Sequence, residues 1–131
     1  MTAQDYINNG YRLSIHTPQA EINAKEELAY NSYIKPILPN ADKEADEIKR
    51  TIMALAFLLL LQANIFSTRS GAKIKTAPQS SNANEWQILN ETAVTAHSYL
   101  ENLKNSPEAV PNAKIYDVAH IYLRTQFFYL L

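Results

Sequence analysis

Residues 51–67 read TIMALAFLLLLQANIFS, a run that contains no charged side chain. A helix that crosses a bilayer needs roughly 20 mostly apolar residues. The densest part of this run, residues 52–61, is shorter than that, and Gln62 and Asn64 interrupt the residues after it. Because polar side chains are costly in lipid, the run predicts a helix that is buried on nearly every side within a bundle.

Length and composition limit the kinds of protein in which this helix can lie. The chain has 131 residues, of which 47% are hydrophobic, and this suits one domain, residues 1–131, with a single core. A chain of this size has few elements that can surround a helix, so we expect self-association. The net charge of −1 gives no general attraction to nucleic acid. The lack of cysteine excludes disulfides and thiolate metal sites.

Helical signals also lie before the apolar run. Residues 5–9 predict a short helix that ends at Gly10, and residues 17–35 predict a longer one with Thr17 as the cap and Pro18 at the first helical position. The face that this second helix turns to the core is expected to hold Ile22, Ala29 and Tyr33, with Leu28 close to it.

Two long helices are predicted after these. The first is expected to start near residues 40–42, with Asn40 or Asp42 as the cap, and to end around Ile65 or Phe66. The second covers roughly residues 84–105. Its apolar residues recur at spacings of three and four and form one seam: Trp86, Leu89, Ala93, Ala96, Leu100 and Leu103.

A polar segment, residues 67–84, separates these two helices. Within it the stretch AKIKT alternates in character, as a short β-strand does. The segment also carries a basic cluster around one of the two glycines of the chain: Arg69, Gly71, Lys73 and Lys75. Such a cluster is either a solvated loop or an arm that meets an acidic neighbour or a phosphate backbone. We adopt the second interpretation as the working hypothesis.

Residues 112–131 end in RTQFFYLL, which is hard to leave bare in water. Their spacing fits a helical stripe, while their β-branched and aromatic content also suits a strand. Aromatic residues are common at interfaces. We therefore expect Phe127, Phe128 and Tyr129 to dock on the core, to pack on a partner, or to do both.

The sequence predicts no catalytic, cofactor-binding or metal site. Asp117 and His120 stand at i and i+3, but a di-iron bundle repeats such a pair on a second helix, and the chain has no second copy. No activated-serine motif is present. We therefore expect a protein without catalytic activity. From the helical signals we expect an all-α fold. It is a small bundle with a long central apolar helix and a long loop or short β arm, residues 67–84, between its second and third main helices.

In this order of elements the chain resembles the small helical head–tail connector proteins of tailed bacteriophages, also called adaptor or head-completion proteins, in the versions found in phages and prophages of Bacteroidota. The resemblance covers residues 17–105. It rests on the phrase NSYIKPILP, the apolar helix IKRTIMALAFLLLLQANIF and the loop STRSGAKIKTAPQSSNANEW before a third helix.

The resemblance implies a structural virion protein that forms or joins a ring, commonly a dodecamer, beneath the portal at the head–tail junction. Its partners would be itself, the portal protein and a stopper or tail-completion protein. Double-stranded DNA would pass through the ring without sequence readout, and assembly would take place in the cytoplasm of the bacterial host. Two alternatives stay open: a small membrane-associated protein anchored by residues 52–66, and a generic helical protein-binding module.

Overall fold

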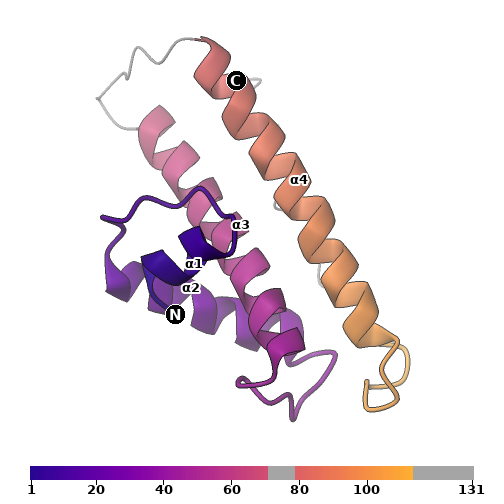
Figure 1. The fold of residues 1–131 in the computed structure, drawn as a ribbon. Coiled ribbons are helices and arrows are strands. Elements are labelled where there is room, and N and C mark those ends of the chain that lie inside the picture. Colours follow the sequence, from indigo (N-terminus) through magenta and orange to yellow (C-terminus); the bar gives the residue numbers. More distant parts are fainter. Residues whose placement is uncertain (71–78, 114–131) are drawn as a thin grey trace.

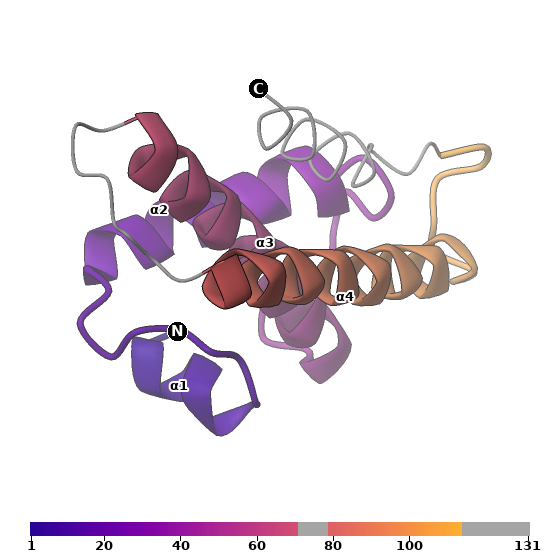
Figure 2. The same ribbon diagram turned by 90° about the horizontal axis from the view of Figure 1, so that it is seen from above.

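The computed structural model describes the backbone of residues 1–70 and 79–113, and the side chains of residues 1–63 and 87–113. Within these residues the regular elements are all helices, so the predicted helical class is confirmed. They are α1 (Ala3–Asn8), α2 (Gln19–Ala29), the π-helical turn η1 (Tyr30–Ile34), α3 (Asp46–Ser70) and α4 (Gln79–Lys104). Figure 1 shows α3 and α4 side by side and antiparallel, and α3 also packs against α2 (Figure 2).

The core surrounds the first half of α3. Each of residues 51–60 is at most 7% exposed. One face of α3 joins a cluster with α1 and α2 that contains Met53, Phe57 and Leu60. The other face, which includes Leu55 and Leu58, joins a larger cluster with α2, η1 and α4. The apolar run is thus divided between two packing surfaces, because apolar side chains occupy all sides of the helix.

The predicted apolar faces of the neighbouring helices are mostly correct. On α4, Leu89, Ala93, Ala96, Leu100 and Leu103 are buried, whereas the side chain of Trp86 lies outside the described residues. On α2 and η1, Ile22, Ala29 and Tyr33 are buried. Leu28 is 42% exposed, so its expected place near this face was wrong. A step of one residue from Ala29 turns the side chain by about 100° around the helix and brings it to the solvent side.

Several predicted helix ends need correction. Pro18, not Thr17, is the N-cap of α2, and no side chain caps this end. The hydroxyl of Thr17 instead donates to the carbonyl oxygen of Ser14, at 2.7 Å. The α-helix also ends earlier than predicted, because Lys35 N–H donates to Tyr30 O, at 2.9 Å, in the i to i−5 pattern of a π-helix.

The start of α3 lies later than predicted. Asp42 Oδ1 accepts a hydrogen bond from the backbone N–H of Glu44, at 2.9 Å, and Ala45 N–H donates to Asp42 O, at 3.1 Å. These contacts make a local turn, so Asp42 does not cap the helix, which begins at Asp46.

The segment between α3 and α4 is shorter than the predicted loop, residues 67–84. Residues 67–70 belong to α3 and residues 79–84 to α4. Small polar residues favour a loop, but a helix tolerates them at small cost once its other turns are fixed by packing. The stretch AKIKT, residues 72–76, lies outside the described residues.

Candidate interaction surfaces

The residues predicted to make contacts fall at the edge of the described structure or beyond it. Arg69 is the last residue but one of α3, and its side chain is outside the described residues. Gly71, Lys73 and Lys75, like Phe127, Phe128 and Tyr129, lie entirely outside them. The described residues therefore do not test the contacts of these side chains, and their roles stay predictions.

The sequence also raised a metal centre and a membrane anchor as possible sites. Among the described residues, no group of three or more acidic or histidine side chains is placed to hold a metal ion, and Asp117 and His120 lie outside this part. His97 is half exposed on α4, with Nε2 at 3.5 Å from Glu101 Oε1. No helix of the described part has a stretch long and apolar enough to cross a bilayer.

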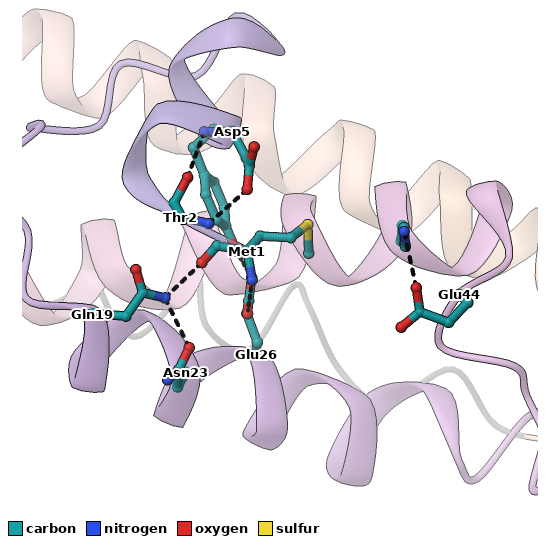
Figure 3. A network of polar contacts seen from close by, with 9 residues as sticks. Met1, Thr2, Asp5, Gln19, Asn23, Glu26 and Glu44 are labelled. Atoms are coloured by element: carbon teal, nitrogen blue, oxygen red, sulfur yellow. Dashed lines mark hydrogen bonds and ion pairs between the residues drawn. The ribbon is translucent and has the colours of Figure 1, made fainter.

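A polar network joins the N-terminus to α2 (Figure 3). The Met1 ammonium lies 3.0 Å from Glu26 Oε1, and the Tyr6 hydroxyl donates to Glu26 Oε2 at 2.8 Å. Gln19 Nε2 donates to Met1 O, at 2.8 Å, and to Asn23 Oδ1, at 2.9 Å. Glu26 and the Met1 ammonium are both largely shielded from water. One carboxylate thus fixes α1 on α2 through two separate groups.

The same network orients α1. Thr2 Oγ1 accepts from the backbone N–H of Asp5, at 3.2 Å, and Asp5 Oδ2 accepts from the backbone N–H of Thr2, at 2.7 Å. This reciprocal pair is a capping box. Hydrogen bonds from the Thr2 backbone and hydroxyl hold the pKa of Asp5 below its ordinary value. A helix of six residues is marginal alone, so its capping and its link to Glu26 both support it.

Tyr30 forms a second contact centre, where η1 begins. Its hydroxyl donates to Ala41 O at 2.7 Å, and its ring has Lys43 Nζ at 4.4 Å and Lys35 Nζ at 5.8 Å from the centroid. Tyr30 also lines a hollow of about 290 Å³, together with Met1, Glu26 and Lys43. Charges of both signs line this hollow, so it favours no ligand of one sign.

Two further hollows meet beside α3 at Arg12 and Phe57. One, of about 320 Å³, is lined also by Tyr11, Ile88 and α4 residues up to Thr95. The other, of about 340 Å³, is lined also by Leu13, Leu60 and Leu61. Because both hollows share Arg12 and Phe57, we call the pair the Arg12 groove. Its lining mixes apolar side chains with charged and hydroxyl side chains.

Arg12 has an unusual position in this groove. Its side chain is exposed, and no carboxylate of the described residues lies within ion-pair distance of it. Glu21 and Glu91 line the groove too, yet neither pairs with Arg12. The groove is therefore lined by one cation and two carboxylates, and, like the hollow beside Tyr30, it favours no ligand of one sign.

Tyr11 gives this region a measurable response to alkali. Its ring lies 5.0 Å from that of Phe57, between centroids. Burial raises the pKa of Tyr11 to about 12, from an ordinary value of 10.0. Burial, then the hydrogen bond to Glu26, also raises the pKa of Tyr6. In the unfolded chain both phenols would lose their protons near pH 10.

We expect the free energy of unfolding to fall as the pH rises from 10 towards 12. Above pH 10 the unfolded state binds fewer protons than the native state, so the slope of stability against pH is negative. Tyr11→Phe keeps the ring and removes one ionisable group, and should make this slope shallower. Urea unfolding at a series of pH values measures it. An unchanged slope in the variant would show that Tyr11 ionises as freely in the native protein as in the unfolded chain.

Sequence reasoning missed both the Glu26 network and the Arg12 groove. The one local signal was the pair Thr2 and Asp5, whose spacing fits a capping box. Tyr6 and Glu26 are 20 residues apart, and nothing local connects them. Arg12 stands in a loop with no periodicity, where only the folded chain places it beside Phe57.

Comparisons of the chain with protein families, with curated proteins and with solved structures found no match.

Proposed function

We propose that this chain is a structural subunit of the head–tail junction of a tailed bacteriophage, of the Bacteroidota phage or prophage type. In this role it forms or joins a ring beneath the portal, extends the DNA channel and docks stopper or tail proteins. The chemistry required is that of contact surfaces, without catalysis, cofactor or metal. The fold class agrees with this role, since the described residues form a bundle of helices.

One observation supports the proposal above the others. Two of the sequence features that carry the resemblance, the phrase NSYIKPILP and the apolar helix, lead into a pair of long antiparallel helices. NSYIKPILP, residues 31–39, covers η1 after its first residue and the turn that follows. The apolar run forms the buried half of α3, and α4 lies antiparallel to α3 (Figure 1). In the proposal α3 is the long central apolar helix of the connector, and basic residues between the buried part of α3 and α4 contact a neighbour.

These basic residues supply a test. In the proposed ring Arg69, Lys73 and Lys75 contact an adjacent subunit or the portal, where loss of three charges weakens association. We expect the triple change of these residues to Ser to reduce assembly while far-UV circular dichroism stays the same. Binding to a purified portal ring from a Bacteroidota phage, followed by size exclusion and electron microscopy, measures the effect.

A matched triple variant controls for loss of charge in general. Lys25 lies on α2, Lys35 directly follows η1, and Lys104 is the last residue of α4, so all three lie outside residues 67–84 of the sequence. Their change to Ser removes the same number of positive charges and should leave assembly near the wild-type level. Equal assembly by all three proteins would reject the role of the basic segment. No portal binding by the wild type would reject the proposed function.

A generic helical protein-binding module is the second candidate. The Arg12 groove favours it, because a surface hollow lined by both apolar and charged side chains can receive a segment of a partner protein. This candidate needs neither a ring nor a portal. The two candidates differ in the partner they require, and portal binding separates them.

A further inference from the structure

The side of α3 that shares a core cluster with η1 and α4, which we call the η1 side, is completely buried. Leu55 and Leu58 on α3, Ile34 on η1 and Leu100 on α4 are all fully shielded from water within this cluster. Among the described elements, α3 packs closely on α2 and on α4, whereas η1 approaches neither α3 nor α4 as closely. Because protein interiors are close-packed, a further apolar segment must fill the space between η1 and α4.

The turn after α4 leads the chain to this side. Val110 N–H donates to Ile37 O, at 2.9 Å, and Ala113 is 7% exposed and belongs to the same cluster. Asn112, between them, has a φ of 59°, a left-handed conformation that asparagine tolerates better than most residues. The chain therefore enters residue 114 from the core and not from the solvent.

Composition selects the segment that can fill this space. Two stretches lie outside the described backbone, residues 71–78 and residues 114–131. The first reads GAKIKTAP and holds one large apolar side chain, Ile74. The second has apolar residues at spacings of three and four, which share one face of a helix: Tyr116, Ala119, Leu123, Phe127 and Leu130. As a helix it would be about 27 Å long, enough to run along residues 51–60 of α3, which span about 15 Å.

We infer that residues 114–131 cover the η1 side of their own subunit, with the face that carries Leu123 and Phe127 turned towards α3. The segment starts at Ala113, which the cluster already holds, so its effective concentration at the η1 side far exceeds that of a segment from a second copy. The inference goes beyond the proposed function and does not depend on a ring. It assigns the aromatic end of the chain to the interior of one subunit.

An acid on the inner face of the segment tests this packing in the full chain. Leu123→Asp buries a charge without a partner, so it should lower the equilibrium constant of folding about tenfold or more. Thr125→Asp is the matched control, because two residues along a helix turn the side chain by about 200°, to the solvent side. Its stability should stay near that of the wild type. Urea unfolding followed by circular dichroism measures both. Equal losses in the two variants, or no loss in either, would overturn the inference.

Spin labels show which subunit supplies the segment. The chain has no cysteine, so Val94→Cys, at an exposed position of α4, and Thr125→Cys carry labels at these two positions alone. Pulsed electron paramagnetic resonance on the doubly labelled protein, diluted into an excess of unlabelled protein, should give one narrow distance. A broad distribution would show that nothing holds the segment on its own subunit, and would overturn the inference.

A mixture of the two singly labelled proteins, unfolded and refolded together, is the control for exchange between subunits. The distance found in the doubly labelled protein should be missing from this mixture. If the mixture gives the same distance, a neighbouring copy supplies the segment, and the inference is overturned.

Discussion

Replacing Leu58 by Ala should lower the free energy of unfolding by about 2–5 kcal/mol, the range found for buried leucines. Leu58 is fully buried in the middle of α3, within the larger core cluster. The change removes apolar contacts and leaves a cavity that the surrounding helices can fill only in part. Because α3 packs against both α2 and α4, its neighbours on both sides limit that relaxation.

Urea unfolding monitored by circular dichroism measures this loss. Val94→Ala is the matched control, because Val94 lies on α4 and is 64% exposed. A substitution at such a site usually changes stability by about 0.5 kcal/mol or less. Equal stability of the Leu58 variant and the wild type would contradict the packing of α3 between α2 and α4.

Replacing Glu26 by Gln should lower the free energy of unfolding by about 1.5–3 kcal/mol, because hydrogen bonds to a charged group are among the strongest. The side chain of Glu26 is 14% exposed, and it accepts from the Tyr6 hydroxyl and pairs with the Met1 ammonium. The amide keeps the shape but removes the charge. Both carboxylate oxygens of Glu26 accept a hydrogen bond, whereas the NH₂ group of Gln can only donate. One of the two donors would therefore lose its acceptor.

A double-mutant cycle with Tyr6→Phe isolates the contact between the two side chains. The loss in the double variant should be smaller than the sum of the single losses by about 0.5 kcal/mol or more. Glu21→Gln, at an exposed position of the same helix, is the control for loss of charge on α2 and should have little effect. Additive losses of Tyr6 and Glu26 would contradict the network.

The spacing of the apolar residues correctly predicted most of the buried faces of α2 and α4. The seam from Leu89 to Leu103 is buried on α4 as the spacing indicated, and Ile22 and Ala29 are buried on α2. Helix ends were less predictable, since they depend on competition among local hydrogen bonds. Asp42 is a good cap in principle, but here its carboxylate and carbonyl serve a turn that precedes α3.

The interaction surfaces were mostly beyond prediction from the sequence. The Arg12 groove forms only where a loop, α3 and α4 come together in the folded chain. The charges that line it come from residues that are far apart in the sequence. The Glu26 network joins residues that are far apart in the chain. The basic cluster from Arg69 to Lys75 was visible in the sequence because its residues are neighbours there. Binding of the triple Ser variant to portal rings tests whether this cluster makes a contact.

Assembly of the chain with itself and with a portal is the central claim. The most direct test is the solution mass of the untagged protein, measured by light scattering after size exclusion, alone and after mixing with a purified portal ring. We predict a large closed oligomer, either in the protein alone or once the portal is added. A strict monomer that the portal leaves unchanged would contradict the claim.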